Sequence, residues 1–286
     1  MRRGQTFERL MQTVFFLCAC VAVASVILIC IFLFSGGAPA LKEIGVLRFL
    51  TGRRWEPGRE TFGVLTMIAG SFAVTLGAVL LGVPVGILTA VYLSFFCPAR
   101  LRRVLRPAVD LLAGIPSVVY GFFGLTVLVP AVRRLFGGSG YSVLAVSVVL
   151  AIMILPTVVS VSESSLSAVG DGYYEGARAL GAGHERSVFR VMLPAARSGI
   201  SAAVTLGLGR AIGESMAVVM VAGNQAIFPK SLLVGTRTLT SNIVLEMGYA
   251  ADLHADALIA TGVVLFVIVM LNNLIFALLR RRRMKK

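Results

Sequence analysis

The sequence predicts an all-α protein, a polytopic transmembrane bundle of six helices. Of its 286 residues, 57% are hydrophobic and only 14% are charged, against about 25% charged in an average soluble domain. The apolar residues are gathered into uninterrupted blocks, each long enough for the roughly 20 residues that cross a bilayer as a helix. Basic residues flank these blocks, as they do in the cytoplasmic loops of membrane proteins. The net charge of +14 therefore indicates a partner in membrane lipid and no nucleic-acid partner.

The six blocks give one membrane domain, residues 13–279, between a cytoplasmic arm at 1–12 and a basic cytoplasmic tail at 280–286. The predicted spans are residues 13–34, 64–96, 108–132, 141–165, 196–222 and 257–279. The first block has about 21 residues before Ser35, whereas the apolar part of a secretory signal has only about 7 to 15. We therefore predict a retained first helix.

Prolines and glycines predict bent, closely packed helices. Pro84, Pro116 and Pro156 each fall within a predicted span, where each removes one backbone hydrogen bond. Small residues four apart, Gly82 with Gly86 and Gly209 with Gly213, would let helix backbones approach each other. Lys and Arg are more numerous in the first, third, fifth and last connecting segments than in the others. This bias predicts that both termini lie in the cytoplasm.

The connection between the fourth and fifth spans, residues 168–194, reads as two short helices joined at Gly181 to Gly183. The spacing predicts that Tyr174, Ala177 and Leu180 share one side of the first helix. Charged residues cover the rest of both helices. An exposed amphipathic hairpin of this kind suits a groove on a partner protein.

Six residues of this connection have the spacing of a known loop signature: Glu175, Ala177, Gly181, Val191, Leu193 and Pro194. The pattern resembles the loop of ABC importer permeases, from which only Gly176 departs. The resemblance implies the type I ABC importer permease fold and a loop that docks into a cleft on an ATPase subunit. The chain has no Gly-x-x-x-x-Gly-Lys-Ser/Thr phosphate loop. We therefore expect no catalytic residue and no cofactor in this chain, with ATP and magnesium bound by the partner ATPase.

Two charged residues, Arg210 and Glu214, fall deep within the fifth block. If the helix is continuous they lie one turn apart, and Arg210 is about 20 Å from the start of the span near Ala196. Charge at the bilayer centre costs at least about 2.5 to 3.5 kcal/mol, which pairing only partly offsets. An interhelical ion pair that fixes packing is one interpretation. The other is a site on the translocation path, where a guanidinium captures an oxyanion and Glu214 balances its charge when the path is empty.

The remaining polar residues are expected to be peripheral. Glu163 falls near the inner end of the fourth span and is expected at the membrane interface. His184 and His254 are isolated in sequence, and neither they nor the cysteines have metal-ligand spacing, so no metal site is predicted.

Two further stretches, Leu112 to Gly121 and Gly235 to Gly248, resemble the phosphate-specific permeases of the ABC family, the second of them the outer loop of their C-type subunit. The resemblance implies a bacterial inner-membrane importer of inorganic phosphate. Its partners would be a second homologous permease, two ATPase subunits and an extracytoplasmic phosphate-binding protein. A permease for sulfate, molybdate or phosphonate is the nearest alternative. A secondary transporter driven by an ion gradient and an ion channel are more distant ones.

Overall fold

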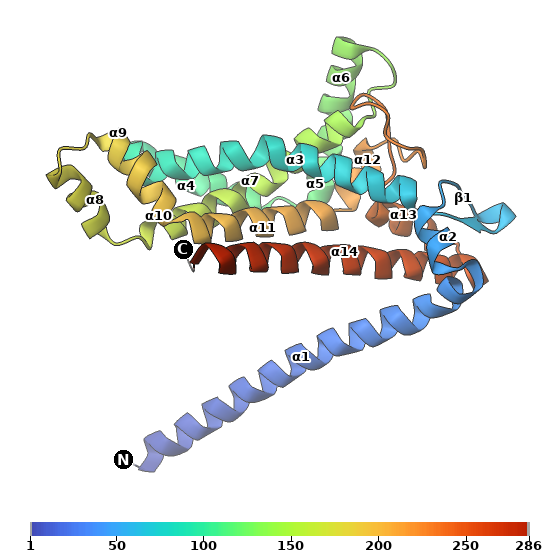
Figure 1. Ribbon diagram of the computed structural model, residues 1–286, viewed down its shortest axis with the longest axis horizontal. Coiled ribbons are helices and arrows are strands. Elements are labelled where there is room, and N and C mark those ends of the chain that lie inside the picture. The colour runs from blue at the N-terminus through green and yellow to red at the C-terminus, as the bar shows by residue number, and fades with distance from the viewer. Residues whose placement is uncertain (1, 285–286) are drawn as a thin grey trace.

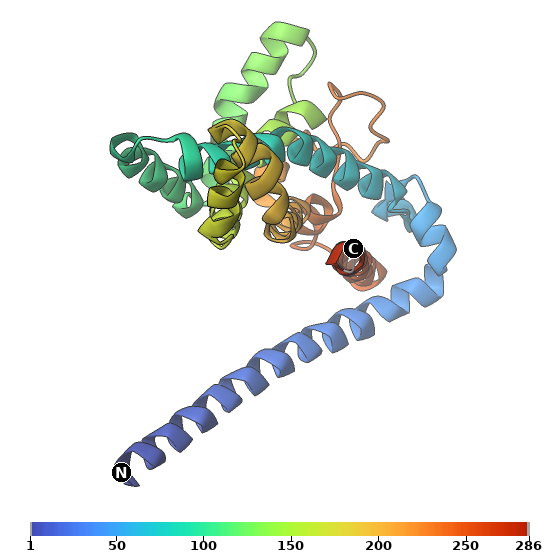
Figure 2. The same cartoon turned by 60° about the vertical axis from the view of Figure 1, so that its left-hand side comes forward.

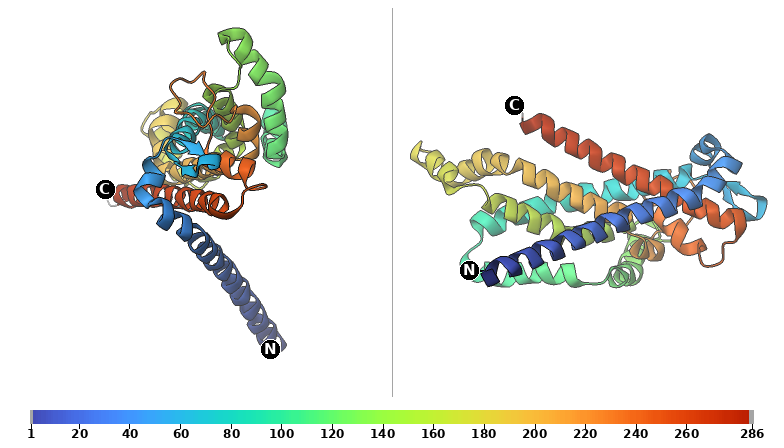
Figure 3. Two further views of the ribbon diagram at one scale, coloured as in Figure 1. Left: turned by 90° about the vertical axis from the view of Figure 1, so that its right-hand side faces the viewer. Right: turned by 90° about the horizontal axis from the view of Figure 1, so that it is seen from below.

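The computed structural model describes residues 2–284, with the side chains of Glu8 and of residues 10–278. Four helices, α3, α7, α11 and α14, run side by side along the long axis (Figures 1 and 3). The elements are α1 Arg2–Ile44, α2 Val46–Thr51, β1 Trp55–Glu56, η1 Pro57–Arg59, β2 Thr61–Phe62, α3 Leu65–Val91, η2 Tyr92–Phe96, α4 Ala99–Gly114, α5 Ser117–Phe123, η3 Gly124–Leu128, α6 Val129–Phe136, α7 Val143–Ser167, α8 Asp171–Ala179, α9 His184–Ser187, η4 Val188–Met192, α10 Leu193–Ala195, α11 Arg197–Gly213, α12 Met216–Val221, α13 Leu239–Glu246 and α14 Asp252–Met284.

Within the described residues, five helices are long and apolar enough to cross a membrane. A sixth is reached if the bent pair His184–Ala195 and Arg197–Gly213, which meet at 68°, is one span. The six predicted spans agree with this upper number. Helix α8 lies at one end of the bundle, while α2, the β1–β2 hairpin and α13 lie at the other (Figure 1).

Glycines allow α3 to pack closely on α7. A Cβ on Gly82 would lie 2.9 Å from the carbonyl oxygen of Ala151, and one on Gly86 would lie 2.7 Å from the side chain of Val158. The predicted role of these two glycines is confirmed. The same prediction for Gly209 and Gly213 is wrong within this chain, because a Cβ on either would meet nothing within 4 Å. That side of α11 is open.

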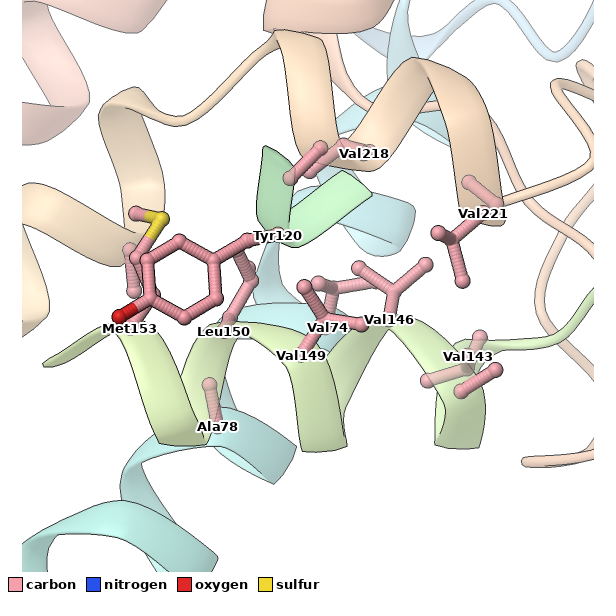
Figure 4. Packing of buried hydrophobic residues seen from close by; sticks show 14 of the residues in the cluster. Val74, Ala78, Tyr120, Val143, Val146, Val149, Leu150, Met153, Val218 and Val221 are labelled. Carbon is pink, nitrogen blue, oxygen red and sulfur yellow. The ribbon is translucent and has the colours of Figure 1, made fainter. Parts of the chain in front are cut away.

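Valine-rich packing fills the centre of the bundle (Figure 4). Buried side chains of α7, such as Val146, Leu150 and Met153, meet Val74 of α3 and Val218 of α12. Where water surrounds the molecule, burial of each such side chain contributes about 1.5 to 3 kcal/mol to the free energy of unfolding. Within a bilayer, close packing of these surfaces against each other takes over that role.

The third predicted span, 108–132, is divided between two helices. Helix α4 ends at Gly114, and Ile115 takes an extended backbone with ψ of 124°. A proline disfavours helical geometry in the residue before it, and Pro116 does so here. The hydroxyl of Tyr120 in α5 donates to the backbone oxygen of Leu112 at 2.8 Å, which fastens the two helices at the break.

Helix α1 is longer than predicted and stands away from the bundle (Figure 2). It continues through Pro39 to Ile44, and it packs on α14 near its end, where Gly37 lies against Ala260 and Phe34 meets Phe266 edge to face. Its most apolar 18-residue stretch has no buried residue. The predicted cytoplasmic arm and basic tail include Met1 and residues 285–286, which lie outside the described residues, as do the side chains of Arg2, Arg3 and residues 280–283.

Candidate functional site

The predicted helix pair at 168–194 forms α8 and the continuous run α9–η4–α10, and Gly181 makes the turn between them. Gly181 has φ of +85°, a conformation that glycine adopts without steric cost. Its N–H donates to the carbonyl of Arg178 at 2.9 Å, and the N–H of Ala182 donates to Ala177 at 3.0 Å. These two bonds make the Schellman arrangement, which satisfies the last carbonyls of a helix. The glycine of the loop signature is therefore required by the turn.

Aromatic contacts hold the loop against the helix ends beside it. The hydroxyl of Tyr174 and Nδ1 of His184 are 2.7 Å apart and share a hydrogen bond. The His184 ring meets Phe96 edge to face, with centroids 4.7 Å apart. The sequence suggested that His184 is isolated, but in the structure it joins α8 to α9 and both to η2, which follows α3. These contacts tie the loop to the bundle.

Of the three residues predicted to share one side of the first loop helix, Leu180 lies elsewhere. Tyr174 and Ala177 are half-buried, whereas Leu180 is 91% exposed. The helix stops at Ala179, so the turn carries Leu180 outward. Leu180 and the exposed Glu175 of α8 therefore form a surface that a partner can reach.

The remaining signature residues lie where the chain re-enters the bundle. Val191 is half-buried in the π-helical turn η4, and Leu193 is half-buried at the start of α10. Pro194 is exposed, and near the N-terminus of a helix its missing N–H costs nothing. The structure thus gathers all six signature residues into one segment at the end of the bundle.

Arg210 lies in the last turn of α11, half-buried. Its Nη1 donates to the hydroxyl of Thr157 in α7 at 3.3 Å. Among the described residues, no carboxylate oxygen lies within 4.0 Å of its guanidinium. Arg210 therefore keeps hydrogen-bond donors that the bundle does not use.

The predicted helical pair of Arg210 and Glu214 is wrong, because α11 ends at Gly213. Glu214 has an extended backbone with ψ of 130°. Its Oε1 accepts the backbone N–H of Ala217 at 3.1 Å, and its carbonyl accepts the hydroxyl of Thr240 at 2.8 Å. Glu214 thus stabilises a break between α11 and α12.

Glu163, near the end of α7, is buried within the protein, with its side chain 7% exposed. Arg102 Nη2 lies 2.7 Å from Glu163 Oε1, and Arg106 contacts the other carboxylate oxygen. Arg106 also binds Asp110 at 3.2 Å. The four-residue spacing of the two arginines on one helix face was the signal in the sequence, but it did not reveal their common partner on α7.

A second buried carboxylate, Glu246 of α13, was not identified from the sequence. Arg237 Nη1 lies 2.6 Å from Oε1, while the indole N–H of Trp55 donates to Oε2 at 2.7 Å and His254 Nε2 lies 2.9 Å from the same oxygen. Burial opposes ionisation, but the hydrogen bonds from Trp55, His254 and Arg237 outweigh it and hold the pKa of Glu246 below its ordinary value. This network, which we call the outer clamp, joins the hairpin, α13 and α14.

Comparison with known proteins identifies a family, and similar proteins include two bacterial permease proteins. The family model described as binding-protein-dependent transport system inner membrane component matches residues 82–285. The probable ABC transporter permease protein YqgH of Bacillus subtilis is 40% identical over 93% of this chain and 88% of its own length. The phosphate transport system permease protein PstC of Mesorhizobium japonicum is 38% identical over 85% of this chain and 80% of its own.

Solved structures share the fold. A chain of the inward-facing MetNI methionine ABC transporter gives a TM-score of 0.64 at 22% identity, covering 80% of this chain and 99% of its own. A chain of a bacterial alginate ABC transporter, in complex with an alginate-bound periplasmic protein, gives 0.65 at 17% identity, covering 95% and 96%. The predicted fold class, a transmembrane bundle of the type I ABC importer permease kind, is confirmed.

Proposed function

Because the chain belongs to the family of binding-protein-dependent transport system inner membrane components, we propose that it is the permease subunit of an ATP-driven importer of inorganic phosphate. The relatives named as phosphate transport permeases, PstC, carry this proposal. This chain covers 80% of the length of the one from Mesorhizobium japonicum and 87% of the one from Haemophilus influenzae. The two stretches that resembled phosphate permeases in the sequence agree with it.

The segment α8–α10 is proposed to receive motion from the ATPase. Its exposed apolar tip at Leu180 and its charged flank suit a groove on a partner protein. Two ATPase subunits would bind ATP and magnesium, while this chain contributes no catalytic residue. Glu175, Ala177, Gly181, Val191, Leu193 and Pro194 would form the coupling segment.

The importer is proposed to contain a second homologous permease and an extracytoplasmic phosphate-binding protein. The open side of α11 at Gly209 and Gly213 and the unburied apolar length of α1 are surfaces for the second permease and for lipid. We place the α8 end in the cytoplasm of a bacterial cell. Helix α1 begins and α14 ends toward that same end (Figure 1), which agrees with two cytoplasmic termini.

Arg210 is the residue proposed to meet phosphate along the path. Among the described side chains, its guanidinium has one hydrogen-bond partner, a hydroxyl at 3.3 Å, and it offers planar paired donors that suit an oxyanion. Glu214 lies four residues on, at the break, where its negative charge would oppose tight retention of the anion.

Uptake of radiolabelled phosphate and sulfate by the reconstituted complex tests the proposal. We expect ATP-dependent uptake of phosphate, and loss of most of it in Arg210→Gln although the subunits still assemble. Arg210→Lys keeps the charge but loses the planar donors, so partial uptake is expected.

Three results would contradict the proposal. Preference for sulfate would assign another oxyanion, and uptake driven by an ion gradient without ATP would indicate a secondary transporter. Normal phosphate uptake by Arg210→Gln would remove Arg210 from the path.

A further inference from the structure

A line of polar side chains on α7 leads from Arg210 toward the α8 end of the bundle (Figure 1). The hydroxyl of Thr157 accepts a hydrogen bond from Arg210. Three residues on, the hydroxyl of Ser160 accepts one from Nη2 of Arg106 in α4 at 3.3 Å. Glu163 comes three residues after that. Residues three apart are neighbours on a helix surface, so these side chains form one polar stripe about 9 Å long, which we call the α7 stripe.

Helix α4 faces the α7 stripe with two arginines one turn apart, Arg102 and Arg106. Both contact the carboxylate of Glu163, and Arg106 also contacts Asp110 at 3.2 Å. A guanidinium has five N–H donors. Among the described side chains, Arg106 uses three of its donors and Arg102 uses one. Both arginines therefore keep donors for a further acceptor.

This face of α4 is open. Arg102 is 46% exposed and Asp110 is 53% exposed. Charged side chains of a spanning segment face the bundle interior or a water-filled cavity, because lipid does not solvate them. Arg102, Arg106 and Asp110 are spaced by four residues and share one side of the helix. This side of α4 therefore lies against water, next to the α7 stripe.

The charge of α4 favours an anion beside the α7 stripe. The helix carries four arginines: Arg100, Arg102, Arg103 and Arg106. Among the described residues, the carboxylates within 4.0 Å of them are those of Asp110 and Glu163. A surface lined with excess charge of one sign raises the local concentration of the opposite ion. Anions are therefore attracted to this end of the stripe.

We propose that Arg102 and Arg106 form a second phosphate site, between Arg210 and the cytoplasm. This inference rests on the proposed function, because it assumes a chain that carries phosphate past Arg210. It adds the residues that receive the anion one turn of α7 further on. Planar donors from two guanidinium groups suit the oxygens of a phosphate.

Glu163 keeps the second site weak. Its carboxylate already occupies donors on Arg102 and Arg106, so an arriving phosphate competes with it. A site on a transport route must bind well enough for entry and weakly enough for release. A buried carboxylate between two arginines meets both requirements, whereas two unpaired arginines would retain the anion.

The test measures how unlabelled phosphate inside proteoliposomes slows the ATP-driven uptake of radiolabelled phosphate. It uses the complete transporter with its binding protein, in zwitterionic lipid. Phosphate inside the vesicle occupies the second site and delays the next transport cycle. In Arg102→Gln we expect the internal concentration that halves the uptake rate to rise at least about tenfold, from the loss of one hydrogen bond to a charged group. Arg106 still pairs with Glu163 in this variant, so α4 stays attached to α7.

Glu163→Gln should lower the same internal concentration, because both arginines lose their competitor. Disturbed packing would instead move both variants in one direction. Arg102→Lys keeps the charge but not the planar donors, so an intermediate value is expected. Co-purification of the ATPase subunits and the uptake rate without internal phosphate check that each variant assembles.

The matched control is Arg103→Gln, which removes the same charge from the next residue of α4. Arg103 is exposed, and among the described residues it has no carboxylate within 4.0 Å. Its half-inhibiting concentration should equal that of the unaltered transporter. A shift of equal size in Arg102→Gln and Arg103→Gln would overturn the proposal, because it would reflect the charge of the helix and no specific site.

Other results would also overturn it: no inhibition by internal phosphate in the unaltered transporter, an unchanged value in Arg102→Gln, or a rise in Glu163→Gln. A shift seen only in vesicles that contain anionic lipid would assign the arginines to a lipid headgroup instead. If the unaltered complex takes up no phosphate with ATP, the proposed function itself has failed. If uptake is normal and Arg210→Gln abolishes it, but internal phosphate inhibits the α4 variants alike, only the second site has failed.

Discussion

Two buried carboxylates, Glu163 and Glu246, are each contacted by basic side chains from other elements. Their side chains are 7% and 8% exposed. A buried carboxylate is costly unless it is paired and hydrogen-bonded, which both are. These residues therefore fix how distant segments meet: Glu163 joins α7 to α4, and Glu246 joins α13 to the hairpin and α14.

Replacing Glu163 with glutamine is expected to destabilise the protein by about 1 to 3 kcal/mol, since it removes the charged acceptor for Arg102 and Arg106. The solvent exposure of both arginines keeps the loss below that of a fully buried pair. Denaturant unfolding in mild detergent measures it. Glu185→Gln changes an exposed carboxylate of α9 and should alter stability by less than about 0.5 kcal/mol. Equal effects of the two substitutions would show that Glu163 contributes nothing through its arginines.

The outer clamp should weaken in acid. The pKa of Glu246 in the folded protein is lower than its ordinary value. Ionised Glu246 therefore contributes its full stability at any pH above the ordinary value. The contribution is lost as the pH falls through the lowered folded-state pKa. Between about pH 6 and about pH 3 the protein should therefore lose more stability than Glu246→Gln does.

Trp55 fluorescence during thermal unfolding reports this loss directly, because its indole donates to Glu246. Glu56→Gln, in the exposed pair with Arg59, should keep the pH profile of the unaltered protein. Parallel profiles for the unaltered protein and Glu246→Gln would refute the role of Glu246.

At the scale of elements, local backbone chemistry decides where helices stop. Gly181 ends α8 through a left-handed turn, and Pro116 separates α4 from α5. Both residues are visible in the sequence, and both act within a few residues of themselves. The end of α11 at Gly213 is different, because the distant Thr240 donates to the carbonyl of Glu214, in addition to the local bond from Ala217 to its side chain. No local pattern indicated that break.

Valine at Gly181 should uncouple ATP hydrolysis from transport, whereas valine at Gly176 should not. A Cβ has open space at both positions, but only Gly181 has positive φ, where a branched side chain is strained. The left-handed conformation costs roughly 1 to 2 kcal/mol for a residue with a Cβ, so the turn between α8 and α9 would rearrange.

The ratio of phosphate transported to ATP hydrolysed measures this coupling in proteoliposomes. Gly176→Val keeps the turn and serves as the control for adding bulk to the same loop. A normal ratio in Gly181→Val, with the ATPase subunits bound, would contradict the proposed role of the turn.

At the scale of the whole molecule, the two ends have different features. One end carries the α8–α10 segment, and the other carries the hairpin and α13, which the outer clamp joins (Figure 1). Between the two ends, α3 packs closely on α7, and α11 has its open side. Under the proposed function, the α8–α10 end would receive the ATPase and the opposite end would face the binding protein.

The sequence by itself determined the all-α membrane bundle, the number of blocks and the loop signature. Length and apolar continuity decide whether a helix crosses a bilayer, and Gly181 decides its own turn, so neither needs distant contacts. It also identified Arg210 as an unusual charge. The roles of all the proposed site residues remain predictions for the uptake experiments.

Only the tertiary structure decided which charges meet. Glu163 lies 57 residues from Arg106 in the chain, and Glu246 lies 191 residues from Trp55. The break that separates Arg210 from Glu214 likewise depends on Thr240, from a segment brought near by folding. The pattern of a single helix specifies which face is apolar, but the partner of a buried charge depends on how several helices pack, and that information is distributed over the whole chain.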